Sequence, residues 1–311
     1  MRWSLFLTLI LSLGLTLAAR GADAPESIAG LGPVGPVVKL FGDFKFTEGP
    51  AADRQGNVFF TDIPASRIHK IDSADKLSVF REPSNSTNGL MFNGAGELVG
   101  CEMQGRVVAM SADGQTIRPL AETYEGKRFN APNDLVVDRA GGVYFTDPHF
   151  RAPEPLPQGV TAVYYIAADG KVTRLIDDLK APNGVILSLD EKTLYVIPSM
   201  QAEMMAYSVE GPGKLGKGRV FCTLAQPEGK TGTGGDGLTV DERGNLYITS
   251  GLGLQVFSPE GQALGIIKLP EQPANVTFAG PDGKTLYVTA RTSLYTVPMS
   301  IRGHVFPGAA K

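Results

Sequence analysis

The sequence predicts an all-β fold, a six-bladed β-propeller with four-stranded blades whose ring is closed by an N-terminal strand. Two observations predict it. One β-rich unit recurs six times, and the last copy lacks a strand while a spare strand precedes the first copy. Repeats of this length with β content are typical of propeller blades. No segment shows a sustained helical period.

Each copy of the unit opens with an acidic or amide residue, continues through a short apolar strand and a tight turn, and ends in a second apolar strand. The copies begin at Glu48, Asn88, Asn133, Asn183, Asp236 and Asn275, and successive copies start 39 to 53 residues apart. Gly and Asp fill the turns because they tolerate positive φ. β-branched and aromatic residues fill the second strands, as a half-buried pleated surface favours.

The two ends of the repeat indicate how the ring closes. Segment 37–41 is strand-like and precedes the first copy. After the two strands of the sixth copy, only one further strand, 293–297, follows. Pairing the spare strand with the incomplete last blade hides both sheet edges. We therefore expect residues 25–311 to form a single propeller domain.

Residues 1–24 are predicted to be a secretory signal. A basic start precedes the apolar run 4–18, and Ala22-Asp23-Ala24 matches an A-x-A cleavage site. The run is marginal for spanning a bilayer, and no later segment is apolar and long enough to do so. We expect an exported protein, periplasmic or secreted, without a membrane span after cleavage.

Charge and cysteine content exclude some classes of protein. The formal net charge is −3 and there is no basic block, which argues against nucleic acid as a partner. Cys101 and Cys222 are too few for a disulfide framework. We expect two buried thiols, with a single long-range disulfide left open as the alternative. The sequence does not indicate an oligomeric state.

The opening residues of the six copies form a candidate cation site. Each begins an innermost strand, so all six should approach the axis at similar height. Glu48 and Asp236 are carboxylates, the other four are amides, and Asp134 adds a third acid. Carboxylates gathered in a narrow channel raise each other's pKa or need a cation. Oxygen ligands alone favour a hard ion, Ca²⁺ before Mg²⁺ or Mn²⁺.

A structural interpretation competes with this one. Asn-Gly and Asp-Gly are turn signals wherever they occur, so Asn88 and Asn275 are interpreted as turn residues. Glu48 does not fit that interpretation, because Glu is a poor turn former and Glu48-Gly49-Pro50 departs from the pattern of the other copies. For Asp236 the spacing alone leaves both interpretations open.

Four motifs resemble the gluconolactonase family, which includes senescence marker protein and luciferin-regenerating-enzyme-like proteins. They occur in the family's order and are Glu48-Gly49-Pro50, 128–134, Pro182-Asn183-Gly184 and Asp236-Gly237. The resemblance spans residues 40–300 and implies a six-bladed propeller with a divalent ion, often Ca²⁺, at its axis.

By motif match, the resemblance implies metal ligands at Glu48, Asn183 and Asp236, with Asn133 facing the substrate or a metal-bound water. It also implies Asp236 as proton acceptor and Arg128 as a substrate contact. Here Ala131-Pro132 separates Arg128-Phe129-Asn130 from Asn133-Asp134, a spacer that the animal proteins of the family lack.

These observations predict a metal-dependent hydrolase of small lactones or esters. One divalent cation, Ca²⁺ or else Mg²⁺, Mn²⁺ or Zn²⁺, would polarise the carbonyl and lower the pKa of water. Asp236 is the expected general base and Asp134 the second candidate.

Two loops, 148–159 and 226–235, are expected to shape the pocket, and His149 in the first is a candidate substrate contact. The alternative functions are a non-catalytic propeller that binds a ligand or protein, or a sugar-acid enzyme of other chemistry. They stay open because a propeller fold does not by itself determine function.

Overall fold

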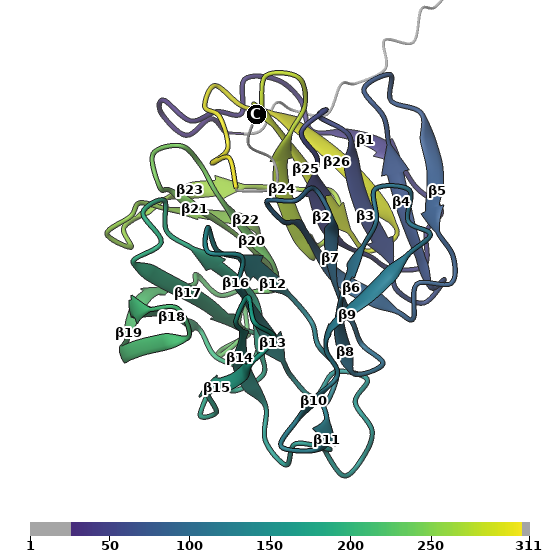
Figure 1. Cartoon of the computed structure of the whole chain (residues 1–311). Coiled ribbons are helices and arrows are strands. Elements are labelled where there is room, and N and C mark those ends of the chain that lie inside the picture. The colour runs from purple at the N-terminus through teal and green to yellow at the C-terminus, as the bar shows by residue number, and fades with distance from the viewer. Residues whose placement is uncertain (1–25, 307–311) are drawn as a thin grey trace, which may run out of the picture.

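The structure is a computed structural model that describes residues 26–306, and these residues form six four-stranded antiparallel sheets around a central axis (Figure 1). The predicted six-bladed propeller is therefore confirmed. The predicted signal, residues 1–24, lies outside the described residues. Within the described part of the chain, no helix has the length and apolar character to cross a bilayer.

The first three blades follow one another along the chain, each with its strands in sequence order from the axis outward. Their strands are β2 (Thr47–Ala52), β3 (Val58–Asp62), β4 (Arg67–Ile71) and β5 (Leu77–Arg81); β6 (Thr87–Phe92), β7 (Leu98–Glu102), β8 (Arg106–Met110) and β9 (Ile117–Ala121); and β12 (Leu135–Val137), β13 (Val143–Asp147), β14 (Ala162–Ile166) and β15 (Val172–Ile176). A two-stranded hairpin that the sequence did not predict, β10 (Thr123–Tyr124) with β11 (Lys127–Arg128), separates the second blade from the third.

The remaining blades repeat this order. Their strands are β16 (Pro182–Leu187), β17 (Thr193–Pro198), β18 (Glu203–Gly211) and β19 (Lys214–Thr223); β20 (Leu238–Val240), β21 (Leu246–Ser250), β22 (Gly253–Phe257) and β23 (Ala263–Ile267); and β24 (Asn275–Ala279), β25 (Thr285–Ala290) and β26 (Ser293–Pro298). The innermost strands contact one another in sequence order, and β24 contacts β2, which completes the ring.

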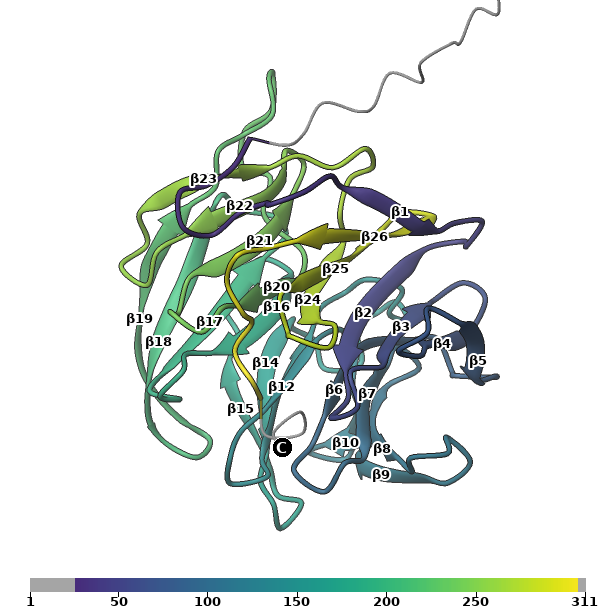
Figure 2. The ribbon, with the colours of Figure 1, turned by 90° about the horizontal axis from the view of Figure 1, so that it is seen from above.

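The ring closes where the repeat predicted. Strand β1 (Val38–Phe41) pairs antiparallel with β26, with Val38 opposite Thr296 and Lys39 opposite Tyr295. Figure 2 shows β1 alongside β26, at the outer edge of the last blade. Because β1 supplies the fourth strand, the last blade gains the partner that its own segment of the chain lacks.

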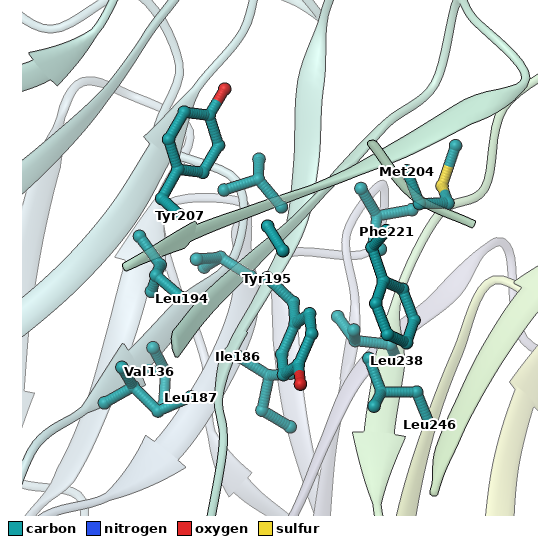
Figure 3. Packing of buried hydrophobic residues seen from close by; sticks show 14 of the residues in the cluster. Val136, Ile186, Leu187, Leu194, Tyr195, Met204, Tyr207, Phe221, Leu238 and Leu246 are labelled. Carbon is teal, nitrogen blue, oxygen red and sulfur yellow. The ribbon is translucent and has the colours of Figure 1, made fainter. Parts of the chain in front are cut away.

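Hydrophobic packing between neighbouring blades forms the core. The largest cluster joins the third, fourth and fifth blades and includes Val136, Leu194 and Leu246, all at most 1% exposed (Figure 3). Within it the rings of Tyr195 and Phe221 meet edge to face at 4.8 Å. Burial of these side chains fixes each blade against the next, so the innermost strands are held at defined positions round the axis.

Both cysteines are buried and unbonded, as expected. Cys101 lies at the second-strand position that Thr61, Thr146 and Thr249 occupy in other blades. Its thiol contacts the backbone oxygen of Asp134 at 3.6 Å. Burial raises the pKa of the Cys101 thiol well above its ordinary value, so this cysteine is a packing residue rather than a nucleophile.

Glu271 joins β1 to the last blade. Its Oε1 accepts hydrogen bonds from Ser293 Oγ at 2.5 Å and Tyr295 OH at 2.8 Å, and lies 3.4 Å from Lys39 Nζ on β1. Burial acts to raise the pKa of Glu271, but the hydrogen bonds from Ser293, Tyr295 and Thr292 outweigh it and lower the pKa to about 2. The ionised carboxylate therefore stabilises the closed ring.

We predict that Glu271→Gln lowers the free energy of unfolding by roughly 1–3 kcal/mol at pH 7, because a charged acceptor is lost. Since the folded pKa is depressed, this stabilisation is full above about pH 4.5 and declines as the pH falls towards 2. Urea denaturation at pH 7 and pH 3 measures the difference, with exposed Glu203→Gln as control. A difference that grows on acidification would contradict this assignment.

Candidate active site

A cavity of about 640 Å³ opens at the end of the axis where the innermost strands begin. Strand starts, second-strand ends and the loops between them supply its walls. Of the predicted site residues, it brings together Glu48, Asn133, Asn183 and Asp236. Residues from both predicted loops also line it, namely Phe150, Arg151, Pro227, Lys230, Thr233, Gly234 and Gly235.

Acids at the ends of second strands position the chain as it enters the site. The Asp62 carboxylate accepts from the backbone N–H of Lys45 at 3.0 Å and of Phe46 at 3.1 Å. Asp147 does the same for Asn130 and Ala131, both at 2.8 Å. These bonds satisfy buried donors of irregular backbone and so fix the segments that lead to Glu48 and Asn133.

Threonine hydroxyl groups near the ends of two second strands connect the first blade to the second and the fifth blade to the sixth. Thr61 Oγ1 donates to the Asn88 backbone oxygen at 3.1 Å, and Thr249 Oγ1 donates to that of Ala274 at 2.8 Å. Each bond runs from a second strand to the segment that opens the following blade. The ring of opening residues is thus held from behind by bonds between blades as well as by packing.

Glu48 and Asp236 come from the first and fifth blades and interact electrostatically across the axis. Burial raises the pKa of Glu48 well above its ordinary value, and the charges of Asp236 and Asp134 raise it further. Burial, followed by the charge of Asp134, raises the pKa of Asp236 to about 7. The Gly49 N–H donates to Glu48 Oε2 at 2.9 Å, which offsets only part of the cost of ionising Glu48.

Asp134 lies behind these two acids rather than in the main cavity. It lines a separate cavity of about 70 Å³ together with Asn275, His304 and Phe306. Burial raises the pKa of Asp134 to about 7, although Leu135 N–H and Asn275 Nδ2 donate to its carboxyl group at 2.9 and 3.4 Å. Its charge therefore acts on the main site from below.

The donor set fits a hard cation. No ion pair among residues 26–306 involves Glu48, Asp134 or Asp236. Residues 26–306 contain no group of three or more His, Cys, Asp or Glu side chains that could hold a metal ion. Amide oxygens would therefore have to complete the site. Two buried carboxylates beside amides, with no thiol or imidazole, match the ligands that Ca²⁺ and Mg²⁺ prefer.

Asn183 is held in place to supply such an oxygen. Its Nδ2 donates to Ser199 Oγ at 2.9 Å, and Ser199 Oγ donates to the Gly235 backbone oxygen at 3.0 Å. Gly235 immediately precedes Asp236. This chain of bonds fixes the Asn183 amide beside the acid of the neighbouring blade.

The structure does not bring two of the expected substrate contacts to the cavity. The Arg128 guanidinium donates to the backbone oxygens of Phe129 and Asn130 at 2.9 and 3.1 Å, on the outer hairpin. His149 is absent from the cavity lining, and its ring lies 4.7 Å from the ring of Phe150, which does line the cavity. Phe150 and Arg151 therefore occupy the place expected for His149.

Comparison with known proteins assigns the chain to one family. The profile of the SMP-30/Gluconolactonase/LRE-like region matches residues 46–292. The chain belongs to this family.

Individual relatives agree with the SMP-30/gluconolactonase/LRE-like assignment. The chain is 29% identical to a gluconolactonase of Zymomonas mobilis, covering 84% of this chain and 81% of the relative, and 28% identical to the lactonase drp35 of Staphylococcus aureus, covering 83% and 84%. Among solved structures, a gluconolactonase from Xanthomonas campestris superposes with a TM-score of 0.80 at 30% identity, covering 89% of this chain and 95% of that one.

The apolar lining of the cavity is what sequence reasoning missed in this SMP-30/gluconolactonase/LRE-like chain. Phe46, Ile63 and Met103 line the cavity, and none of them was predicted to do so. The polar lining residues Lys230 and Gln272 were not singled out either. A signal was present for two of them, because Ile63 and Met103 directly follow the second-strand acids Asp62 and Glu102. Position in the repeat therefore locates them at the same end of the axis as Glu48.

We predict that Asp147→Asn destabilises the protein by roughly 1–3 kcal/mol, because an amide can accept from only one of the two N–H groups that Asp147 satisfies. Urea denaturation measures the change, with exposed Asp178→Asn as the control. Equal stability of the two variants would show that Asp147 does not fix the segment before Asn133.

Proposed function

We propose that this protein is a metal-dependent hydrolase of small lactones or esters. The observation that carries the proposal is the convergence of Glu48 and Asp236 on one cavity, without a paired cationic side chain among the described residues. The Zymomonas and Xanthomonas relatives bear the name gluconolactonase, which supports a lactone as the substrate class.

Glu48, Asn183 and Asp236 are the residues that would hold the cation, with Asn133 beside them on the cavity wall. When bound, a divalent cation supplies Lewis-acid polarisation of a carbonyl oxygen. We propose Ca²⁺. The description of a regucalcin from Agrobacterium tumefaciens as a calcium-binding protein is consistent with this choice.

Asp236 is proposed as the general base. It lines the main cavity, whereas Asp134 lines the smaller one beneath it. A base must lie within hydrogen-bond reach of the proton that it removes, and Asp236 satisfies this condition better. Asn133, only 4% exposed, offers a neutral amide that can orient the substrate carbonyl or the attacking water.

The proposed cellular setting rests on the N-terminal sequence pattern. We propose that the protein is exported to the periplasm or secreted, because residues 1–24 carry the basic, apolar and small-residue regions of a signal.

We predict that Ca²⁺ at about 100 times its Kd raises the free energy of unfolding by about 2.7 kcal/mol, as binding to the folded state alone requires. Glu48→Gln should remove most of this increase, because it deletes one of two carboxylate ligands. Thermal unfolding with Ca²⁺, Mg²⁺, Mn²⁺, Zn²⁺ or chelator measures the effect, with Glu203→Gln as control. Equal response of the two variants would exclude Glu48 as a ligand.

We predict that Asp236→Asn lowers kcat/KM by about 100-fold or more on glucono-δ-lactone and aryl esters, because the proton acceptor is lost. Asp178→Asn is the matched control, and thermal unfolding confirms that each variant is folded. Retained turnover by folded Asp236→Asn would remove Asp236 from the mechanism. Absence of turnover by the wild type with its cation bound would instead favour a non-catalytic binding propeller or a sugar-acid enzyme.

A further inference from the structure

We propose that the substrates of this site are lactones or esters that carry an apolar substituent, seated on an apolar wall of the cavity formed by Phe46, Ile63, Met103 and Phe150. The proposal rests on the proposed hydrolase function and specifies its substrate class. It follows from the uneven distribution of apolar and polar side chains around the acids.

The apolar wall is built from the first three blades. Phe46 precedes β2, Ile63 follows β3, Met103 follows β7, and Phe150 follows β13. Ile63 and Met103 are 4% and 5% exposed and form a buried cluster with Ala131, against which Phe46 and Phe150 pack. The wall is thus a continuation of packed protein interior into the cavity.

The wall is held in position before any ligand binds. The Phe46 N–H is fixed by the Asp62 carboxylate at 3.1 Å, and the Arg291 guanidinium lies 5.8 Å from the centre of the Phe46 ring. His149 contacts Phe150 ring to ring. A preformed apolar surface requires little ordering on binding, so more of the burial energy of a ligand appears as affinity.

The other half of the cavity is polar. Asn183, Ser199, Thr233, Ser250 and Gln272 line it, all contributed by the fourth, fifth and sixth blades and the segments that lead into them. Glu48 and Asp236 lie between the two halves, at the start of the first blade and of the fifth. A ligand whose reacting carbonyl lies over these acids therefore meets hydrogen-bonding groups on one side and the apolar wall on the other. Apart from Glu48, the polar residues that line the cavity from the first three blades are Asn88, Asn133 and Arg151.

Volume and desolvation both argue against a bare polyhydroxy lactone as the best substrate. A cavity of about 640 Å³ has the size of pockets that enclose drug-sized ligands, and a single sugar ring leaves much of it empty. Hydroxyl groups turned towards Phe46, Ile63 and Phe150 would lose water without gaining a hydrogen-bond partner. An alkyl or aryl group in the same place gives up no hydrogen bond to water, and it buries apolar area.

The test is a chain-length series on the wild-type enzyme. We expect kcat/KM for γ-lactones to rise about fourfold for each methylene added to the side chain between methyl and hexyl, the fold-change that corresponds to burying one CH₂. Glucono-δ-lactone, measured alongside, should be a poorer substrate than the hexyl lactone. Affinity for the matching γ-lactams, which resist turnover, should rise in parallel in calorimetric titrations.

Two variants locate the effect. In Phe150→Ala, the ratio of kcat/KM between the hexyl and methyl lactones should fall about tenfold. The reason is that the hexyl chain loses its apolar contacts with the Phe150 ring. Leu264→Ala, on the outermost strand of the fifth blade, should keep the wild-type ratio. Phe150 is partly exposed on a loop, so its replacement leaves the cores of the blades intact.

Each outcome decides a different claim. No turnover of any lactone or ester by the cation-loaded enzyme would overturn the proposed function. Turnover without dependence on chain length, or glucono-δ-lactone preferred to every alkyl lactone, would overturn the apolar substrate class and leave the hydrolase intact. Chain-length dependence that persists unchanged in Phe150→Ala and in Met103→Ala would show that the apolar wall is not its source.

Discussion

The site depends on the cost of holding carboxylates together away from water. Glu48, Asp134 and Asp236 come from three different blades. Burial raises the pKa of Glu48 and of Asp236, and the charge of Asp134 raises both further. Yet no Lys, Arg or His among the described residues forms an ion pair with the three acids. Such an arrangement persists only if protons or a cation neutralise it. The propeller supplies the rigid frame that maintains it.

That frame is built from one local device used repeatedly. A hydroxyl or thiol near the end of a second strand contacts the opening segment of the next blade, as Thr61, Thr249 and Cys101 do, and an acid after it holds irregular backbone, as Asp62 and Asp147 do. Closure through β1 and Glu271 completes the ring. The floor of the site is therefore rigid, and loops from different blades determine which ligand fits above it.

Sequence reasoning predicted most of the fold because the repeat is regular: the turns, the second strands and the spare strand 37–41 all agree with the observed blades. It predicted the acids at the axis because each opens a unit. It did not predict that Arg128 bonds to its own loop, that Phe150 rather than His149 faces the cavity, or that Asp134 lies beneath the site. Those outcomes depend on loop conformation and on strand stagger, neither of which the repeat pattern determines.

The most direct test of the central claim is an anomalous difference map from crystals of the protein grown with Mn²⁺, which scatters where Ca²⁺ would bind. We expect one strong peak at the axis, in contact with the side-chain oxygens of Glu48, Asn183 and Asp236. A map without a peak between Glu48 and Asp236, or electron density that shows a Lys or Arg side chain neutralising them, would contradict it.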